Sequence, residues 1–356
     1  MHRNNKFING KNSIYSSVAS VLLGLLISVV FVVLSSSTGF FDSISLLFRA
    51  LWEGSFGSKN SLIETLVFTT PLLFTGLAHS LAFKTGLFNI GVEGQFVIGM
   101  LAAGLVGIIP GIPPILHSIF ALIAAALGGL LWAVIPGYLK AKTGSNEVVN
   151  SIMMNFIAMY LSNYIVRRIK PPGTEATPLI EKNAELWRFL GSNYRLNIGI
   201  FIALVLIIGV YYLLWKTTVG YELRAVGFNI FASEYAGINI KKNIILAMAL
   251  SGCIAGLGGG AYVTGVQHQV YSLFYLPGFG NDGIAVALVA KSNPFGVILS
   301  SILFGALNLS SGTLMLYGIS KSVSYLIQGT VILFIASEFI YRFIGTKKKK
   351  EAAKDE

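Results

Sequence analysis

Apolar runs of about 20 residues recur along almost the whole chain, and this repetition limits the possible folds more than any other feature of the sequence. A helix rises about 1.5 Å per residue, so such a run crosses the hydrocarbon core of a bilayer. Charged residues make up only 12% of the chain, about half the share found in soluble domains. We therefore predict an all-α polytopic membrane protein with about ten transmembrane helices, some short or broken. The predicted spans are residues 16–34, 61–82, 87–109, 114–136, 148–166, 197–215, 244–266, 281–291, 294–310 and 321–342.

Basic residues lie in short clusters between these runs and at both ends of the chain. Cytoplasmic loops of membrane proteins carry an excess of Lys and Arg. This rule predicts a cytoplasmic N-terminal tail (1–15), a transmembrane domain (16–342) and a basic cytoplasmic C-terminal tail (343–356). One loop departs from the rule, because residues 167–196 fall outside in this scheme and yet hold six Lys and Arg residues. The net charge of +11 is thus interpreted as an orientation signal and not as a sign of a nucleic-acid partner.

Two apolar segments are interrupted. Residues 281–291 are too short for a full span, and residues 86–95 contain Gly86, Gly91 and Gly94 among polar side chains. Discontinuous helices at membrane depth are tolerated where they are packed inside protein or line a cavity. Because the two segments lie far apart in the sequence, they indicate two pseudo-related halves around a central pathway.

The longest loop predicted on the inner side is 216–243, and part of it can form a short amphipathic helix. This stretch runs from Tyr221 to Tyr235, and Gly237 then ends it. One interpretation is a helix that rests on the membrane surface. The other is a coupling helix, a lever docked in a groove of a soluble ATPase and held at both ends by spanning helices. The candidate coupling residues are Tyr221, Glu222, Leu223, Arg224, Ala225, Val226, Gly227, Asn229, Tyr235 and Gly237.

Four segments resemble one family of transport proteins, in that family's order and over roughly residues 60–335. The family is that of the permeases of branched-chain amino acid, ribose and nucleoside importers. The segments are FKTGLFNIGVEGQ (83–95), LKAKTGSNEVV (139–149, followed by Met154 and Asn155), GYELRAVGFN (220–229, followed by AGIN at 236–239) and DGIAVAL (282–288). Two features depart from the family pattern. Phe228 stands where a polar residue is more usual, and Ile230-Phe231 replaces a commoner Pro-Ala type pair.

The resemblance implies a type II ATP-binding cassette (ABC) importer fold of about ten helices, in the cell membrane. It implies a transport subunit that pairs with a second permease, an ATP-binding cassette ATPase and an extracytoplasmic substrate-binding lipoprotein. It further implies that ATP and Mg bind the ATPase partners, so that this chain itself binds no cofactor. The match is closest to the nucleoside branch, whose cargo is purine and pyrimidine nucleosides.

Polar side chains on or near the starts of spans are the candidates for a substrate pathway. An ionisable residue such as Glu93 is costly at membrane depth unless it is paired or hydrated; the alternatives are that it caps a helix or pairs with Lys84. Amide side chains offer both donors and acceptors, as a nucleobase or a ribose requires, although bonds between helices would also account for them. Aromatic rings in these segments can stack on a base or form part of an interfacial belt. The candidate pathway residues are Phe88, Asn89, Glu93, Gln95, Asn150, Asn155, Asn281 and Asp282.

Several motifs are missing from the sequence. There is no glycine-rich phosphate loop followed by Lys and Ser or Thr, so ATP hydrolysis is expected on another chain. We identify no catalytic constellation and no His or Cys spacing suited to a metal. Two alternatives stay open: an importer of the same fold that carries a sugar or a branched-chain amino acid, and an ion-coupled secondary transporter that uses Glu93 or Asp282.

Overall fold

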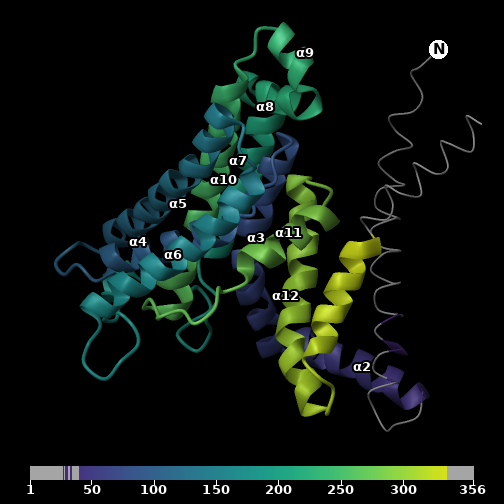
Figure 1. Cartoon of the computed structure of the whole chain (residues 1–356). Helices are drawn as coiled ribbons and strands as arrows, with labels where there is room; N and C mark the ends of the chain where they lie inside the picture. The colour runs from purple at the N-terminus through teal and green to yellow at the C-terminus, as the bar shows by residue number, and fades with distance from the viewer. Residues whose placement is uncertain (1–26, 28, 31–32, 34–39, 335–356) are drawn as a thin grey trace, which may run out of the picture. The chain divides into compact units, whose positions relative to one another are not determined.

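The computed structural model describes residues 27, 29, 30, 33 and 40–334, and the regular secondary structure of these residues is helical (Figure 1). The predicted first span, 16–34, lies outside the described residues except for four positions, and so do both predicted tails. The elements are α2 (Phe40–Ser55), α3 (Lys59–Lys84), α4 (Val92–Gly107), α5 (Leu116–Thr143), α6 (Glu147–Ile169), η1 (Lys182–Ala184), α7 (Gly199–Lys216), α8 (Thr218–Phe228), α9 (Ile230–Tyr235), α10 (Ile240–Tyr262), η2 (Val263–Gln267), α11 (Phe279–Val289), α12 (Pro294–Leu316) and a last helix at Ser322–Phe334.

Among the described residues, five helices are long and apolar enough to cross a membrane: α3, α5, α7, α10 with η2, and α12. Three shorter apolar helices accompany them, namely α4, α11 and Ser322–Phe334. The all-helical prediction is therefore confirmed, whereas the count of ten spans and the two related halves are not. The sequence pattern assigned no span to residues 40–55, which form α2 and carry Asp42, Arg49 and Glu53 among apolar side chains.

The chain divides into two compact units, which are described separately here: residues 1–61 with 306–356, and residues 62–305. In the first unit, Glu53 on α2 pairs with Arg49 at 2.8 Å and accepts the hydroxyl hydrogen of Tyr317. Gln328 donates to the Asn308 side chain at 2.9 Å, which links the last helix to the end of α12. The second unit contains every residue proposed from the sequence for a pathway or a coupling loop.

Glycines bring α4, α5 and α10 of the second unit into backbone contact. A Cβ on Gly256 of α10 would overlap the Ala125 carbonyl oxygen of α5, and one on Gly99 of α4 would overlap the backbone of Gly256. Lipid supplies no hydrophobic force between helices, so close approach of small residues is what holds such helices together. In the most apolar 18-residue stretch of each helix, 83% of the residues of α3 are buried but only 22% of those of α5. The helix α3 is therefore central, and α5 lies at the outside of this unit.

The two segments predicted to be broken do form short helices. α4 has 16 residues and α11 has 11, and each is preceded by non-helical chain. Gly86 (φ 75°) ends the turn after α3, and Gly278 (φ 92°) precedes α11; both have the left-handed backbone conformation that glycine adopts at little cost.

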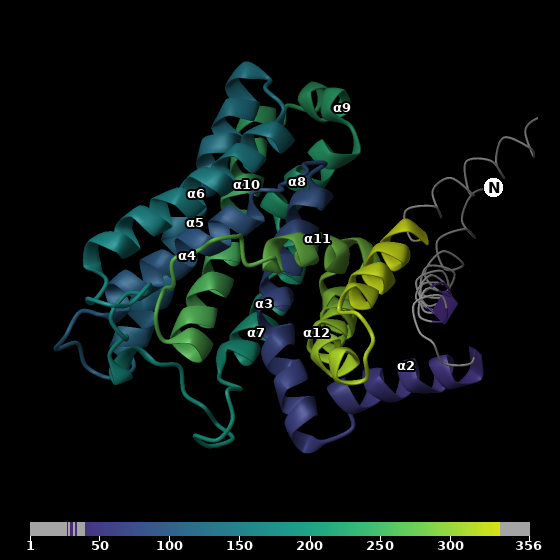
Figure 2. The same ribbon diagram turned by 60° about the horizontal axis from the view of Figure 1, so that its bottom comes forward.

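The basic loop 170–198 is bound to the ends of α4 and α10, at the opposite end of the second unit from α8 and α9 (Figures 1 and 2). Backbone bonds join Glu181 to Gly107, Ile180 to His268 and Leu186 to Thr264. Part of its charge is paired, because Lys170 binds Glu175 and Arg195 binds Glu64. The loop is thus an ordered part of the second unit, held to it by backbone hydrogen bonds.

Candidate functional site

The Glu93 carboxylate lies where the N-termini of α4 and α11 meet. Its oxygens accept the amide hydrogens of Gly278 and Gly280 at 2.6 Å each and of Asn281 at 3.0 Å. The side chain is 0% exposed. Of the two alternatives open for this residue besides a place in the pathway, the structure shows the helix cap, but the capped helix is α11, which lies 185 residues further along the chain.

Asn89 organises a second buried cluster, just before α4. Its amide nitrogen donates to Gln95 at 3.0 Å and to Ser251 of α10 at 2.9 Å, and its oxygen accepts from the amides of Gly91 and Gln95 at 3.1 Å each. Ser251 in turn donates to the Ala78 carbonyl of α3 at 2.9 Å. The cluster therefore ties α3, α10 and the start of α4 together.

Asn155 of α6 holds the same part of α4 from another side. Its oxygen accepts from the Gly94 amide at 2.8 Å, and its nitrogen donates to the Ile90 carbonyl at 3.0 Å. Of the pathway candidates, Asn89, Glu93, Gln95 and Asn155 are thus brought together around the start of α4 and are buried. The exposed or half-buried candidates are Phe88, Asn150, Asn281 and Asp282.

The predicted single helix from Tyr221 to Tyr235 is two helices, α8 and α9, which meet at Asn229. Asn229 has an extended backbone (φ −160°), and its side chain accepts from the Ala232 amide at 3.0 Å. An Asn that caps a new helix start competes with continuation of the previous helix, and this explains the break. Gly237 (φ 81°) follows α9, in agreement with the predicted end of the helical stretch.

The inner face of α8 is fixed to its neighbours. Leu223 and Val226 are buried. Glu222 accepts from Asn243 of α10 at 2.9 Å, and Arg224 donates to the Leu214 carbonyl of α7 at 2.8 Å. These four predicted coupling residues therefore anchor α8 to the bundle, and Ala225 is also half-buried.

The outer face of α8 and α9 carries aromatic side chains. Phe228 is 87% exposed, Phe231 83% and Tyr235 96%, and Tyr221 is also exposed. Exposed apolar patches on a rigid surface mark interaction sites. Phe228 and Phe231 are not among the coupling candidates that the sequence indicates, although both depart from the family pattern and Phe231 is one of the apolar positions of the amphipathic stretch.

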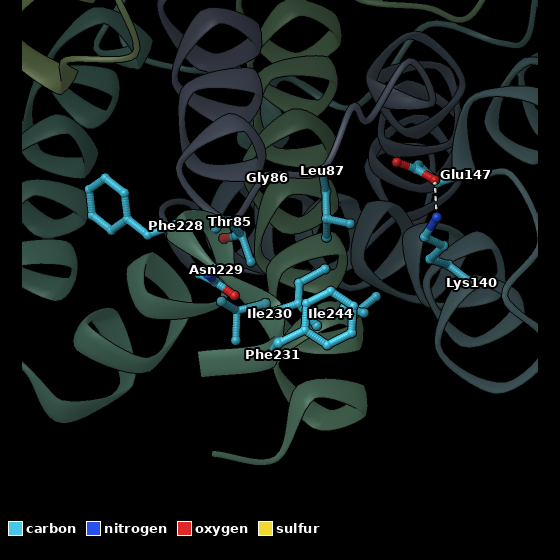
Figure 3. A pocket seen from close by; sticks show the side chains of 12 residues that line it. Thr85, Gly86, Leu87, Lys140, Glu147, Phe228, Asn229, Ile230, Phe231 and Ile244 are labelled. Carbon is cyan, nitrogen blue, oxygen red and sulfur yellow. Dashed lines mark ion pairs between the residues drawn. The ribbon is translucent and has the colours of Figure 1, made fainter. Parts of the chain in front are cut away.

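A cavity of about 350 Å³ opens beside α8, between its C-terminus, the segment after α3 and the α5–α6 turn (Figure 3). Ile230, Phe231 and Ile244 lie together on one side of it, and Lys140 and Glu147 form an ion pair at 2.7 Å on another. Partial burial is the largest single influence on Glu147 and works to raise its pKa, but the hydrogen bond from Lys140, the Lys140 charge and backbone hydrogen bonds together outweigh it and lower the pKa.

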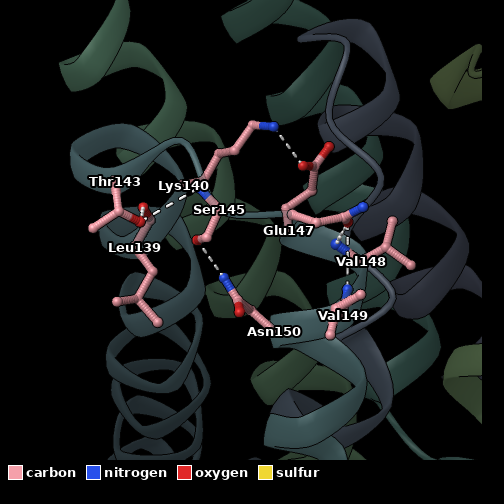
Figure 4. A network of polar contacts seen from close by, with 9 residues as sticks. Leu139, Lys140, Thr143, Ser145, Glu147, Val148, Val149 and Asn150 are labelled. Atoms are coloured by element: carbon pink, nitrogen blue, oxygen red, sulfur yellow. Dashed lines mark hydrogen bonds and ion pairs between the residues drawn. The ribbon is translucent and has the colours of Figure 1, made fainter.

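The α5–α6 turn beside this cavity is held by a small polar network (Figure 4). Asn146 caps α6 by accepting from the Val148 amide at 2.9 Å, and Asn150 donates to Ser145 at 2.7 Å. The half-buried Asn150 therefore stabilises this turn, whereas the buried candidates surround the start of α4.

Five described helices long and apolar enough to cross a membrane, with the short helices α4 and α11 packed among them, are typical of a polytopic membrane protein. The family described as branched-chain amino acid transport system / permease component matches residues 61–336, and the chain belongs to it. It is a transport component and not an enzyme.

Three relatives are informative. The chain is similar to the guanosine ABC transporter permease protein NupP of Bacillus subtilis, with 39% identity over 94% of this chain and 96% of the relative. It is 34% identical to the nucleoside ABC transporter permease protein NupB of Lactococcus lactis, over 85% of this chain and 86% of the relative. It is 26% identical to the guanosine ABC transporter permease protein NupQ of B. subtilis, over 79% of this chain and 91% of the relative. No solved structure matches the chain.

Proposed function

We propose that this chain is the membrane-spanning subunit of an ABC importer that carries nucleosides across the cytoplasmic membrane. The observation that carries the proposal is the 39% identity with a guanosine permease over nearly the full length of both chains. NupB, named as a nucleoside permease, supports the same cargo class.

The same relatives support the proposed partners. NupP and NupQ come from one organism and are both guanosine permeases, which supports a second, different permease subunit. Two ATPase domains that bind ATP and Mg, and an extracytoplasmic binding lipoprotein, complete the transporter. The α8–α9 end is then cytoplasmic, and loop 170–198 faces outward.

The α8–α9 pair is the proposed coupling element. Its inner face is bonded to α7 and α10, whereas Phe228, Phe231 and Tyr235 protrude. A groove on an ATPase that takes up these rings would move α8 as a rigid body, and the spans joined to it would move in turn.

Cargo would pass by alternating access. Four pathway candidates have side chains that are at least partly exposed; of these, Asn150 is bonded within the α5–α6 turn, which leaves Phe88, Asn281 and Asp282 to meet cargo in this conformation. Phe88 is stacked on Phe83 with ring centroids 5.1 Å apart, and the free face of such a ring suits a base. The buried candidates would act on the pathway through the position of α4.

The test is uptake of labelled adenosine, guanosine and uridine in cells that lack this chain, with and without its restoration. We expect uptake to be lost and to return only with the intact chain and with ATP. Competition by excess glucose or leucine separates a sugar or amino-acid importer from a nucleoside importer. Uptake that survives ATP depletion and collapses with the ion gradient would instead establish an ion-coupled transporter.

A further inference from the structure

The Glu93 carboxyl group has backbone amides at a helix N-terminus as partners and, among the residues that the structure describes, no cationic side chain. None of the ion pairs between side chains of residues 40–334 includes Glu93. It stands in the first turn of α4 and faces the first turn of α11, and helix N-termini carry partial positive charge and free amides. Gly278, the residue that precedes α11, has no capping side chain of its own. The amides at the start of α11 therefore supply the hydrogen bonds of the buried carboxylate, and the carboxylate in turn caps α11.

The peptide at Gly280 is held from both sides. Its N–H bonds to Glu93, and its carbonyl oxygen lies 2.9 Å from Nε2 of His79 on α3. The close fit leaves no room for a side chain, because a Cβ on Gly280 would stand 2.5 Å from the Glu93 nitrogen. The N-terminus of α11 is thus clamped between α3 and α4.

The chain segment that leads to Glu93 contacts α8 directly. A Cβ on Gly227 would overlap the Lys84 carbonyl oxygen and lie 3.0 Å from the Gly86 nitrogen. The next residues, 87–91, run into α4 and are fixed to it through Asn89 and Gln95. A short stretch, residues 84–91, therefore connects the contact with α8 to the start of α4.

We propose that Glu93 is a positioning residue, a latch that joins the half-helices α4 and α11, and that α8 works this latch through the contact between Gly227 and residues 84–86. The inference rests on the proposed function in one respect, since it takes α8 as the element that the ATPases move. A buried carboxylate that loses its amides is strongly destabilised until water reaches it. The latch therefore has two discrete states, closed on the amides or open and hydrated.

The test measures access of water to α11. Cys253 is the only cysteine of the chain, so a Cys253→Ala background accepts the substitution Ala287→Cys at a fully buried position of α11. The rate of modification of this thiol by a membrane-impermeant maleimide is measured in vesicles that contain the chain with its partners, without nucleotide. The compared variants are Glu93→Gln, which keeps the shape and removes the charge, and Glu175→Gln, a matched carboxylate change in the exposed loop.

We expect Glu93→Gln to raise the rate about tenfold or more, because hydrogen bonds to a charged group are stronger than those to a neutral one. Glu175→Gln should leave the rate unchanged. An unchanged rate in folded Glu93→Gln protein would overturn the latch. If that variant does not accumulate, Glu93→Asp keeps the charge but cannot reach all three amides, and an unchanged rate there overturns the proposal equally.

Nucleotide addition supplies the second part of the test. With Glu93 intact, ATP should raise the labelling rate, and Gly227→Ala should abolish that rise; persistence of the rise would remove α8 from the scheme. The labelling requires no cargo. If labelling changes as expected but no nucleoside is taken up, the proposed cargo is wrong and the latch stands. If nucleosides are taken up but labelling does not change, only the latch is wrong.

Discussion

Buried amide side chains around the start of α4 act as cross-links between helices. Asn89 uses both its donor and its acceptor atoms, and its partners come from α10, from the first turn of α4 and from the residues just before it. In a bundle where apolar contacts do not distinguish a neighbouring helix from lipid, such bonds select one arrangement of the helices.

Replacing Asn89 tests this role. We expect Asn89→Ala to lower the free energy of unfolding by about 2–3 kcal/mol, since Gln95, Gly91 and Ser251 would each lose a buried partner. Asn183→Ala removes one exposed bond, to Ile112, and should cost less than about 1 kcal/mol. Thermal unfolding of the detergent-solubilised variants measures both. Equal losses would show that the Asn89 cluster has no special weight.

Between elements, Gly227 of α8 lies in close contact with the turn after α3. Gly227→Ala places a methyl group against the Lys84 carbonyl, and overpacking of this kind costs about 1–3 kcal/mol. We expect cargo-stimulated ATP hydrolysis by the complete transporter to fall several-fold. Gly209→Ala on α7 is the matched control, because no atom lies within 4 Å of its added Cβ. The same loss in both variants would remove the contact from the mechanism.

Arg188 of loop 170–198 contacts His268, which follows η2. Burial, followed by the nearby Arg188 charge, lowers the pKa of His268 below its ordinary 6.5, while Glu185 acts in the opposite direction. The Arg188 guanidinium donates to Nε2 of His268, which accepts only when the ring is neutral. A lowered pKa in the folded state means that this stability is complete above about pH 6.5 and is lost as pH falls toward the folded-state pKa.

We therefore expect backbone amides of loop 176–188 to exchange hydrogen faster at pH 5.5 than at pH 7.5, after correction for intrinsic rates. The Ile180 and Leu186 amides, which bond to the 264–268 stretch, should report this most clearly. His268→Gln should remove the pH dependence, because its side chain does not titrate. A dependence that survives in this variant would assign the effect to another group.

For the whole molecule, the proposed assembly with an ATPase would use a surface that the chain leaves exposed. Phe231 is 83% exposed on α9 and lines the cavity beside α8. We expect Phe231→Glu to reduce co-purification of the ATPase about tenfold or more, since buried aromatic residues often dominate interface energies, while the level of the chain in the membrane is unchanged. Phe41→Glu on α2 is a control at a similarly exposed ring, 82% exposed. Equal effects of both changes would contradict a specific docking role.

The sequence by itself determined the helical class, the positions of most helices, the two broken segments and the family. These properties depend on hydropathy, glycines and asparagines within short stretches, so neighbouring residues carry them. The same local pattern could not show that Asn229 divides α8 from α9, since Tyr221 to Tyr235 reads as one amphipathic stretch.

Only the tertiary structure decided what the buried polar groups bind. Glu93 could have faced cargo, capped a helix or paired with Lys84, and its amide partners turned out to lie 185 to 188 residues away. The partner of a carboxylate depends on which helix ends the packing brings together. That packing is set by small residues such as Gly280 and Gly256, whose contacts come from distant parts of the chain.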